Sequence, residues 1–246
     1  MKIHLISVPN RIASDIIKLS HKIGLQLEYT PKGINMYVVI GNGRRDAEII
    51  STLHHYIDHK EVASIVKPQE TGIDALAKSL AIILEKARRA HIKAMLIIDR
   101  DTNDPNNVIE ETINNLKTYG VECKHIGGKN RRGVYNCLKV NKHSLTAIVV
   151  NGLDYINVKQ HEIEDHLLML AQELKNIEIP KGERSKTLWE RISKTYKISH
   201  YELLKEALNS SLIVKALPQH LKAIKNTSTS QSEVIKLHTI TDCFTT

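Results

Sequence analysis

Three short runs of aliphatic residues, each ending in glycine or polar residues, constrain the fold of this chain more than any other feature. They are INMYVVIG at 34–41, AMLIID at 94–99 and LTAIVVNG at 145–152. Each run is apolar throughout, which is typical of strands buried on both faces of a parallel sheet. Between the runs, apolar residues recur at helical spacing. The alternation predicts an α/β fold, with a largely parallel sheet and helices on both faces in a Rossmann-like three-layer arrangement.

Weaker patterns extend this plan over the rest of the chain. A strand, a helix and a second strand are expected within 3–29, further strands at 63–67 and 121–127, and further helices at about 46–58, 73–87, 104–120 and 162–175. The sequence thus predicts an α/β domain at 1–180 with its core at about 34–175, a basic helical extension at 181–226, and a polar linker and tail at 227–246.

Composition narrows the classes of protein and partner. The formal charge of +8 favours an anionic partner, with nucleic acid first. No run of about 18 apolar residues occurs, so no membrane span is expected. Cys123, Cys137 and Cys243 are too few and too scattered for a disulfide framework, which favours a reducing cytoplasm. The sequence gives no indication of oligomeric state.

Two aspartates, Asp99 and Asp101, follow the AMLIID strand. Residues two apart on a strand point the same way. Two carboxylates at the mouth of a sheet repel each other unless a cation lies between them. Mg²⁺ or Mn²⁺ fits, because Mg²⁺ prefers oxygen ligands and often uses one or two carboxylates. The sequence therefore predicts a divalent-metal site here; the alternative is a solvated loop in which an aspartate caps the next helix.

A glycine-rich turn, GNGRRD, follows the first of the three strands. Backbone N–H groups of such a turn, entering a helix, can hold phosphate, and the arginines would assist. The predicted phosphate-binding residues here are Gly41, Gly43, Arg44 and Arg45. The turn is not a Walker loop, since no Gly-Lys-Ser/Thr follows. A sharp turn with surface arginines is the alternative.

Two acids, Glu164 and Asp165, begin a helix just after the third strand. They are candidates for further metal ligands, and the alternative is that they only complement the helix dipole. His161 and His166 are five residues apart without a cysteine partner, so zinc is not expected.

Two sets of basic residues lie in or near loops expected at the same edge of the sheet. Such residues neutralise phosphates, and an ordinary solvated surface is the alternative. They are Lys129, Arg131 and Arg132 in the first set, and Lys181, Arg184 and Lys186 in the second.

The order of these motifs resembles a Toprim-like domain, the metal-binding module of topoisomerases, primases and OLD-type nucleases. More narrowly, it is similar to an uncharacterised archaeal and bacterial Toprim-like family. The resemblance spans about 34–200 and is carried by VVIGNGRRDAEII, by TGIDALAKSL before LIIDRDT, and by IVVNGLD before IEDHLL.

The resemblance implies that Asp99 and Asp101 hold Mg²⁺, and that a glutamate at the end of the first strand acts as general acid or base. Ile40 stands in the place of that glutamate, and Glu48, one helix turn on, is a possible substitute. The leading hypothesis is therefore a metal-dependent nuclease or phosphoryl-transfer protein. The alternatives are a catalytically degenerate nucleic-acid-binding module in a DNA-maintenance or defence complex, and a nucleotide-handling protein that uses the glycine-rich turn.

Overall fold

A computed structural model describes residues 36–41, 43–57, 63–87, 89–126 and 133–228. The elements expected within 3–29, most of the basic loop near residue 130, and the polar tail lie outside these described residues. The core of the α/β domain lies inside them.

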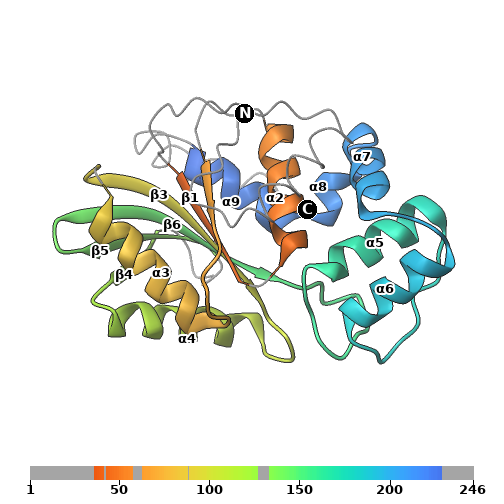
Figure 1. Ribbon diagram of the computed structural model, residues 1–246, viewed down its shortest axis with the longest axis horizontal. Coiled ribbons are helices and arrows are strands. Elements are labelled where there is room, and N and C mark those ends of the chain that lie inside the picture. The colour runs from red at the N-terminus through yellow and green to blue at the C-terminus, as the bar shows by residue number, and fades with distance from the viewer. Residues whose placement is uncertain (1–35, 42, 58–62, 88, 127–132, 229–246) are drawn as a thin grey trace.

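One six-stranded sheet organises the molecule, in the order β2-β1-β3-β6-β5-β4 (Figure 1). The first four of these strands are parallel, β5 runs antiparallel to β6, and β4 runs antiparallel to β5. The predicted α/β fold with a mostly parallel sheet is therefore confirmed. The strands are β1 (Met36–Ile40), β2 (Ala63–Val66), β3 (His91–Asp99), β4 (Glu122–Ile126), β5 (Val134–Lys139) and β6 (Lys142–Asn151).

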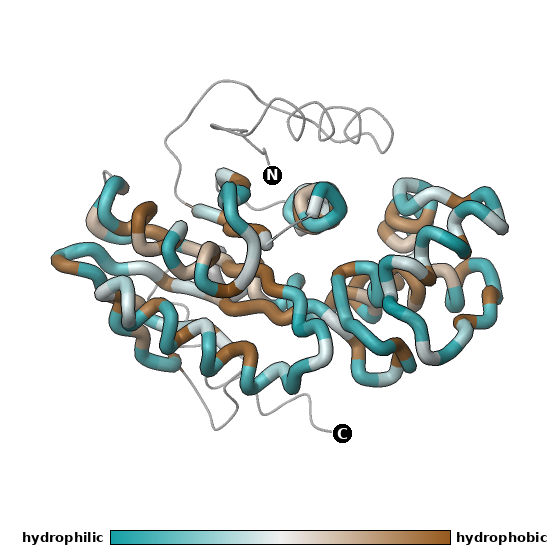
Figure 2. The backbone as a smooth tube through the Cα atoms, turned by 60° about the horizontal axis from the view of Figure 1, so that its bottom comes forward, coloured by the Kyte–Doolittle hydropathy of each residue, from teal (hydrophilic) through white to brown (hydrophobic). Residues whose placement is uncertain are grey.

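The strands are apolar throughout because helices cover both faces of the sheet (Figure 2). Along β3, Leu96 and Ile98 join one buried cluster while Met95 and Ile97 join the other. Helices α3 (Ile73–Lys86) and α4 (Pro105–Thr118) cover the first face. On the other side, α9 (Pro218–Ser228) packs against the sheet next to α2 (Arg44–Ile57). Four further helices share the same buried cluster and lie beside the sheet in Figure 1: α5 (Glu164–Lys175), α6 (Ser185–Thr195), α7 (His200–Asn209) and α8 (Leu212–Ala216).

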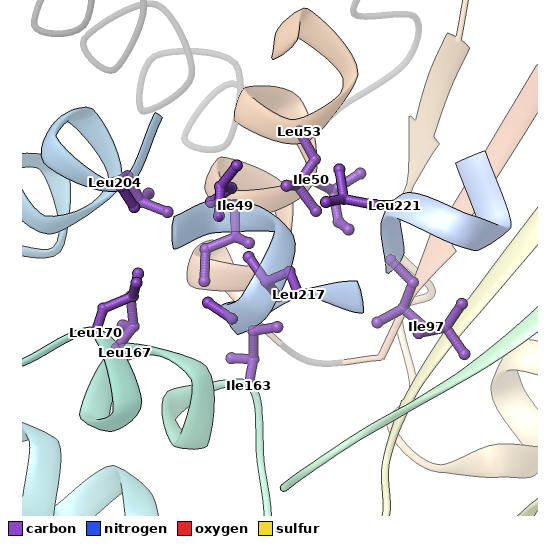
Figure 3. Packing of buried hydrophobic residues seen from close by; sticks show 14 of the residues in the cluster. Ile49, Ile50, Leu53, Ile97, Ile163, Leu167, Leu170, Leu204, Leu217 and Leu221 are labelled. Carbon is purple, nitrogen blue, oxygen red and sulfur yellow. The ribbon is translucent and has the colours of Figure 1, made fainter. Parts of the chain in front are cut away.

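The C-terminal helices share the core of the α/β domain. Helix α9 packs against β6, β3 and α2. Leu217 and Leu221 lie in one buried cluster with Ile50 of α2 and Ile97 of β3 (Figure 3). One helix of the region predicted as an extension, α9, therefore covers part of the sheet. In the described ranges, no helix is long and apolar enough to cross a membrane.

Local signals placed α4 correctly. The Asp104 side chain accepts a hydrogen bond from the Asn106 N–H at 2.8 Å, and Pro105 occupies the first turn. Gly120, with φ of 73°, follows the helix end, where a left-handed residue is favoured. The helix expected at about 104–120 is therefore confirmed.

The β4–β5 hairpin was not expected and changes the interpretation of the cysteines. Its register places Cys123 opposite Cys137, with Cα atoms 4.0 Å apart, and the two form a disulfide. The sequence predicted no disulfide framework because its three cysteines are few and scattered, and these two are 14 positions apart. Antiparallel pairing brings them together, so the view that the cysteines are scattered is corrected. Cys243 lies outside the described residues.

Candidate functional site

A buried aspartate and a half-buried one meet at the carboxyl end of the parallel strands. Asp99 is the last residue of β3, and Asp46 lies in the first turn of α2, which follows β1. Asn151 is the last residue of β6 and lies between them. Its Nδ2 donates to Asp46 Oδ1 at 3.0 Å and to Asp99 Oδ1 at 2.8 Å. Asp46 and Asp99 are called the acid pair below.

Burial and neighbouring negative charges disfavour the ionised form of both carboxyl groups in the acid pair. Burial raises the pKa of Asp46 to about 7, and the charge of Glu164 adds to this rise. Burial also raises the pKa of Asp99 well above its usual value, and the neighbouring Asp46 carboxylate adds to it. The hydrogen bonds from Asn151 oppose both shifts. Two carboxylates this close disfavour each other's ionisation, so a proton or another cation between them is stabilising.

The acid pair faces a cavity of about 300 Å³. The cavity lies where α2, the end of β3 and the chain around the starts of α5 and α6 meet. Four acidic and four basic side chains line it, so it presents both signs of charge to a ligand. The lining residues are Gly43, Arg44, Arg45, Asp46, Asp99, Glu162, Ile163, Glu164, Arg184 and Lys186.

Ion pairs join the acidic and basic sides of the cavity wall. Arg45 Nη1 donates to Glu164 Oε1. Arg184 Nη2 donates to Glu162 Oε1 at 2.6 Å, and Glu162 Oε2 accepts from the Lys186 N–H at 3.2 Å. The Lys186 ammonium has no ion-pair partner among the residues that the structure describes. Counting the described residues alone, the wall therefore offers one cation without an ion pair and two arginines whose carboxylate partners an anionic ligand could replace.

Of the four predicted metal-binding residues, Asp99 and Glu164 line the cavity and the other two do not. Strand β3 ends at Asp99, and Asp101 has φ of 53°, so the alternation expected of a strand stops before it. Asp101 is exposed, and its N–H and C=O both pair with the backbone of His161. Burial and then the charge of Glu162 raise its pKa.

Asp165 is fully buried, and two structural partners contact one of its carboxylate oxygens. Its Oδ2 accepts from the Leu153 N–H at 2.9 Å and lies 2.5 Å from His161 Nδ1. It therefore ties the start of α5 to the loop after β6 and is not among the residues that line the cavity.

Glu48, the predicted substitute for the missing glutamate, faces α7 and does not line the cavity. Its carboxylate accepts from Arg44 Nε at 3.0 Å and Tyr201 Oη at 2.9 Å, and lies 2.6 Å from His200 Nε2. Burial acts to raise its pKa, but these partners outweigh burial and lower the pKa below its usual value. Ile40 is fully buried at the end of β1.

Two buried histidines lie next to Asn151, on the side away from the acid pair: His220 contacts Asn151, and His166 contacts His220. His220 of α9 lies with Nε2 2.9 Å from Asn151 Oδ1. His166 of α5 lies with Nδ1 2.7 Å from Ala216 O, and the two imidazole centroids are 5.0 Å apart. Burial lowers the pKa of both histidines, that of His220 well below its usual value. Both imidazoles are therefore neutral near pH 7.

The structure places some, but not all, of the predicted phosphate-binding residues at the cavity. Gly43, Arg44 and Arg45 line the cavity. Gly41 lies beside β3 instead, and the predicted Lys129, Arg131 and Arg132 fall outside the described residues. The sequence did not single out Asp46, Asn151 or Glu162 as site residues. Asp46 and Asn151 do lie in the strand-end segments GNGRRD and NGLD, which was the available signal.

Gly43 leaves room for the Asp46 carboxylate, and this is testable. A Cβ at position 43 would overlap Asp46 Oδ2. We therefore expect Gly43→Ala to move that carboxylate away from Asn151 and, because the Asn151 hydrogen bond lowers the Asp46 pKa, to raise this pKa further above its usual value. A carboxyl ¹³C NMR titration measures this. Gly41→Ala is the matched control, because its Cβ would come no nearer than 3.7 Å to the Ile97 carbonyl. Equal Asp46 titration in both variants contradicts the prediction.

The comparisons with known proteins add no relative to this picture. The chain matches no protein-family model, no curated protein and no solved structure. What the fold and the cavity define is an α/β protein with a mixed acidic and basic site at the carboxyl edge of its sheet.

Proposed function

We propose that this chain is a divalent-cation-dependent enzyme that acts on phosphodiester bonds of nucleic acid. The observation that carries the proposal is the acid pair, Asp46 and Asp99, facing a cavity that arginine and lysine side chains also line. Acids that bind a cation and bases that bind phosphate are the two requirements of metal-assisted phosphoryl transfer.

The donor set fits a hard cation. Within the described ranges, no group of three or more His, Cys, Asp or Glu side chains is arranged to hold a metal ion. The acid pair offers carboxylate oxygens, and Mg²⁺ commonly uses one or two carboxylates and completes its shell with water and substrate phosphate. Asp46 and Asp99 would hold Mg²⁺ or Mn²⁺, which would neutralise phosphate charge and lower the pKa of a bound water.

Basic residues on the cavity wall would bind the substrate phosphates. Lys186 has no ion-pair partner within the described part of the chain, and it begins α6 beside Arg184. Arg45 and Arg184 can exchange their bonds to Glu164 and Glu162 for bonds to phosphate oxygens, since guanidinium groups bind both anions with two N–H donors. The net charge of +8 favours a polyanionic substrate.

One observation favours a second candidate, a binding module without catalysis. The Toprim-like resemblance implies a glutamate at the end of the first strand, and Ile40 is fully buried there. Glu48 is held by α7 and does not replace it. In this second candidate, the cavity binds nucleic-acid phosphate and turns nothing over.

One assay separates the two candidates. We expect purified protein to cleave single-stranded DNA, double-stranded DNA or RNA with Mn²⁺ or Mg²⁺, and to lose the activity in excess EDTA. The control is an Arg45→Ala, Lys186→Ala double variant, which keeps the acid pair and should lose most phosphate affinity. Salt-sensitive binding without turnover in any metal supports the binding module. Absence of both binding and turnover contradicts both candidates, and stabilisation by free nucleotides alone would then indicate a nucleotide-handling protein.

A further inference from the structure

A histidine of the C-terminal helices contacts the residue that organises the acid pair. Asn151 is fully buried, and both of its hydrogen bonds to Asp46 and Asp99 come from the same amide nitrogen, Nδ2. An amide has one donor end and one acceptor end. If this amide turned over, its oxygen would face two carboxylates and both hydrogen bonds would be lost.

His220 bonds the other end of the same amide. Its Nε2 lies 2.9 Å from Asn151 Oδ1. Because that oxygen can only accept, the Nε2 atom of His220 carries the hydrogen and donates it. His220 therefore selects the amide orientation in which both N–H groups of Asn151 face the acid pair.

Packing fixes His220 in this position. The side chain is fully buried on α9, which lies against β6 and β3. The His166 ring of α5 lies edge-on to it, with centroids 5.0 Å apart, and its Nδ1 contacts the Ala216 carbonyl at the end of α8. The packing of α9 against β6 and β3 thus aims the Nε2 atom of His220 at Asn151.

We propose that His220 is a positioning residue of the candidate site, acting through Asn151 to orient the acid pair for its ligand. The C-terminal helices then belong to the site as well as to the core. The effect on cation binding rests on the proposed function, whereas the orientation of the Asn151 amide does not.

Hydrogen exchange of the Asn151 side-chain amide tests the inference directly. We expect slow exchange of both N–H protons by ¹⁵N NMR in the wild type and in His220→Gln, since glutamine also presents an N–H donor. We expect at least tenfold faster exchange in His220→Leu, which is apolar and of similar bulk. His166→Leu is the matched control, because His166 contacts the same ring but not Asn151. Protection unchanged in His220→Leu, or lost equally in His166→Leu, overturns the inference.

Two further measurements keep the result interpretable. Calorimetric Mn²⁺ titration should show about tenfold weaker binding in His220→Leu and near-wild-type binding in His220→Gln, as expected for one buried hydrogen bond. If the wild type binds no Mn²⁺, the proposed function fails while amide exchange still decides the inference. If His220→Leu does not fold, the imidazole ¹⁵N shifts of the wild type decide it: a hydrogen on Nε2 supports the inference, and a hydrogen on Nδ1 overturns it.

Discussion

Asp99→Asn is expected to reduce metal-dependent cleavage of nucleic acid by about a hundred- to a thousandfold, the range for losing one electrostatic contact to the transition state. Asp99 is the strand-end member of the acid pair and lines the cavity. Asparagine keeps the size of the side chain but removes the negative charge that would hold a cation. The fold should be retained, because the change also removes a half-buried carboxylate whose ionisation desolvation disfavours.

The matched control for this experiment is Asp101→Asn. Asp101 lies two residues away, is exposed, and does not line the cavity. We expect its activity to stay within about threefold of the wild type, well below the loss expected on removing a transition-state contact. Initial rates at saturating Mn²⁺, with circular dichroism to verify folding, measure both variants. Equal losses in the two variants would show that the acid pair is not the metal site, and would favour the Asp99–Asp101 site that strand alternation predicts.

Asp46→Asn is expected to stabilise the protein, and the gain should grow as pH rises from about 4 to about 7. The pKa of Asp46 is raised from 3.8 to about 7 in the folded protein. Between these values the folded state holds a proton that the unfolded state has released, so stability from this group is lost as pH rises. At 1.36 kcal/mol per pKa unit, asparagine should add about 2–4 kcal/mol above pH 7 and little near pH 4.

Urea unfolding of the wild type and the variant at several pH values measures this gain. The difference between their free energies of unfolding isolates Asp46 from other titrating groups, including the buried histidines, whose lowered pKa values act in the opposite direction. Asp104→Asn, at the exposed start of α4, provides the same chemical change away from the acid pair. A difference between Asp46→Asn and wild type that does not vary with pH would mean that Asp46 ionises normally in the folded protein.

A stabilising Asp46→Asn would also explain why the acid is there. A mutually repelling pair of carboxylates, one buried and one half-buried, lowers stability, and proteins accept such a cost mainly at functional sites. Cation binding would relieve the same repulsion. The unfolding measurement therefore bears on the proposed function independently of any assay of cleavage.

The amino-acid sequence by itself determined the layers of the fold and the position of one site residue, Asp99. Continuous apolar runs such as 145–152 cannot face water on either side, so they required a sheet covered on both faces. Helical periodicity, the Asp104 cap and Gly120 placed α4 because these signals act within a few residues. Asp99 was placed in the same way, because it is the polar residue that ends the apolar run of its strand.

Only the tertiary structure decided which acids face each other. Asp46 and Asp99 are joined through Asn151, which is 105 and 52 residues away from them, because β1, β3 and β6 are neighbours in the sheet. The order of the strands along the chain does not reveal which of them are adjacent in the sheet. Helix packing turned Glu48 toward α7 and Asp165 toward Leu153, so both were placed away from the cavity. Spacing in the sequence fixes the face of a helix, whereas its rotation against the sheet follows from how the whole core packs.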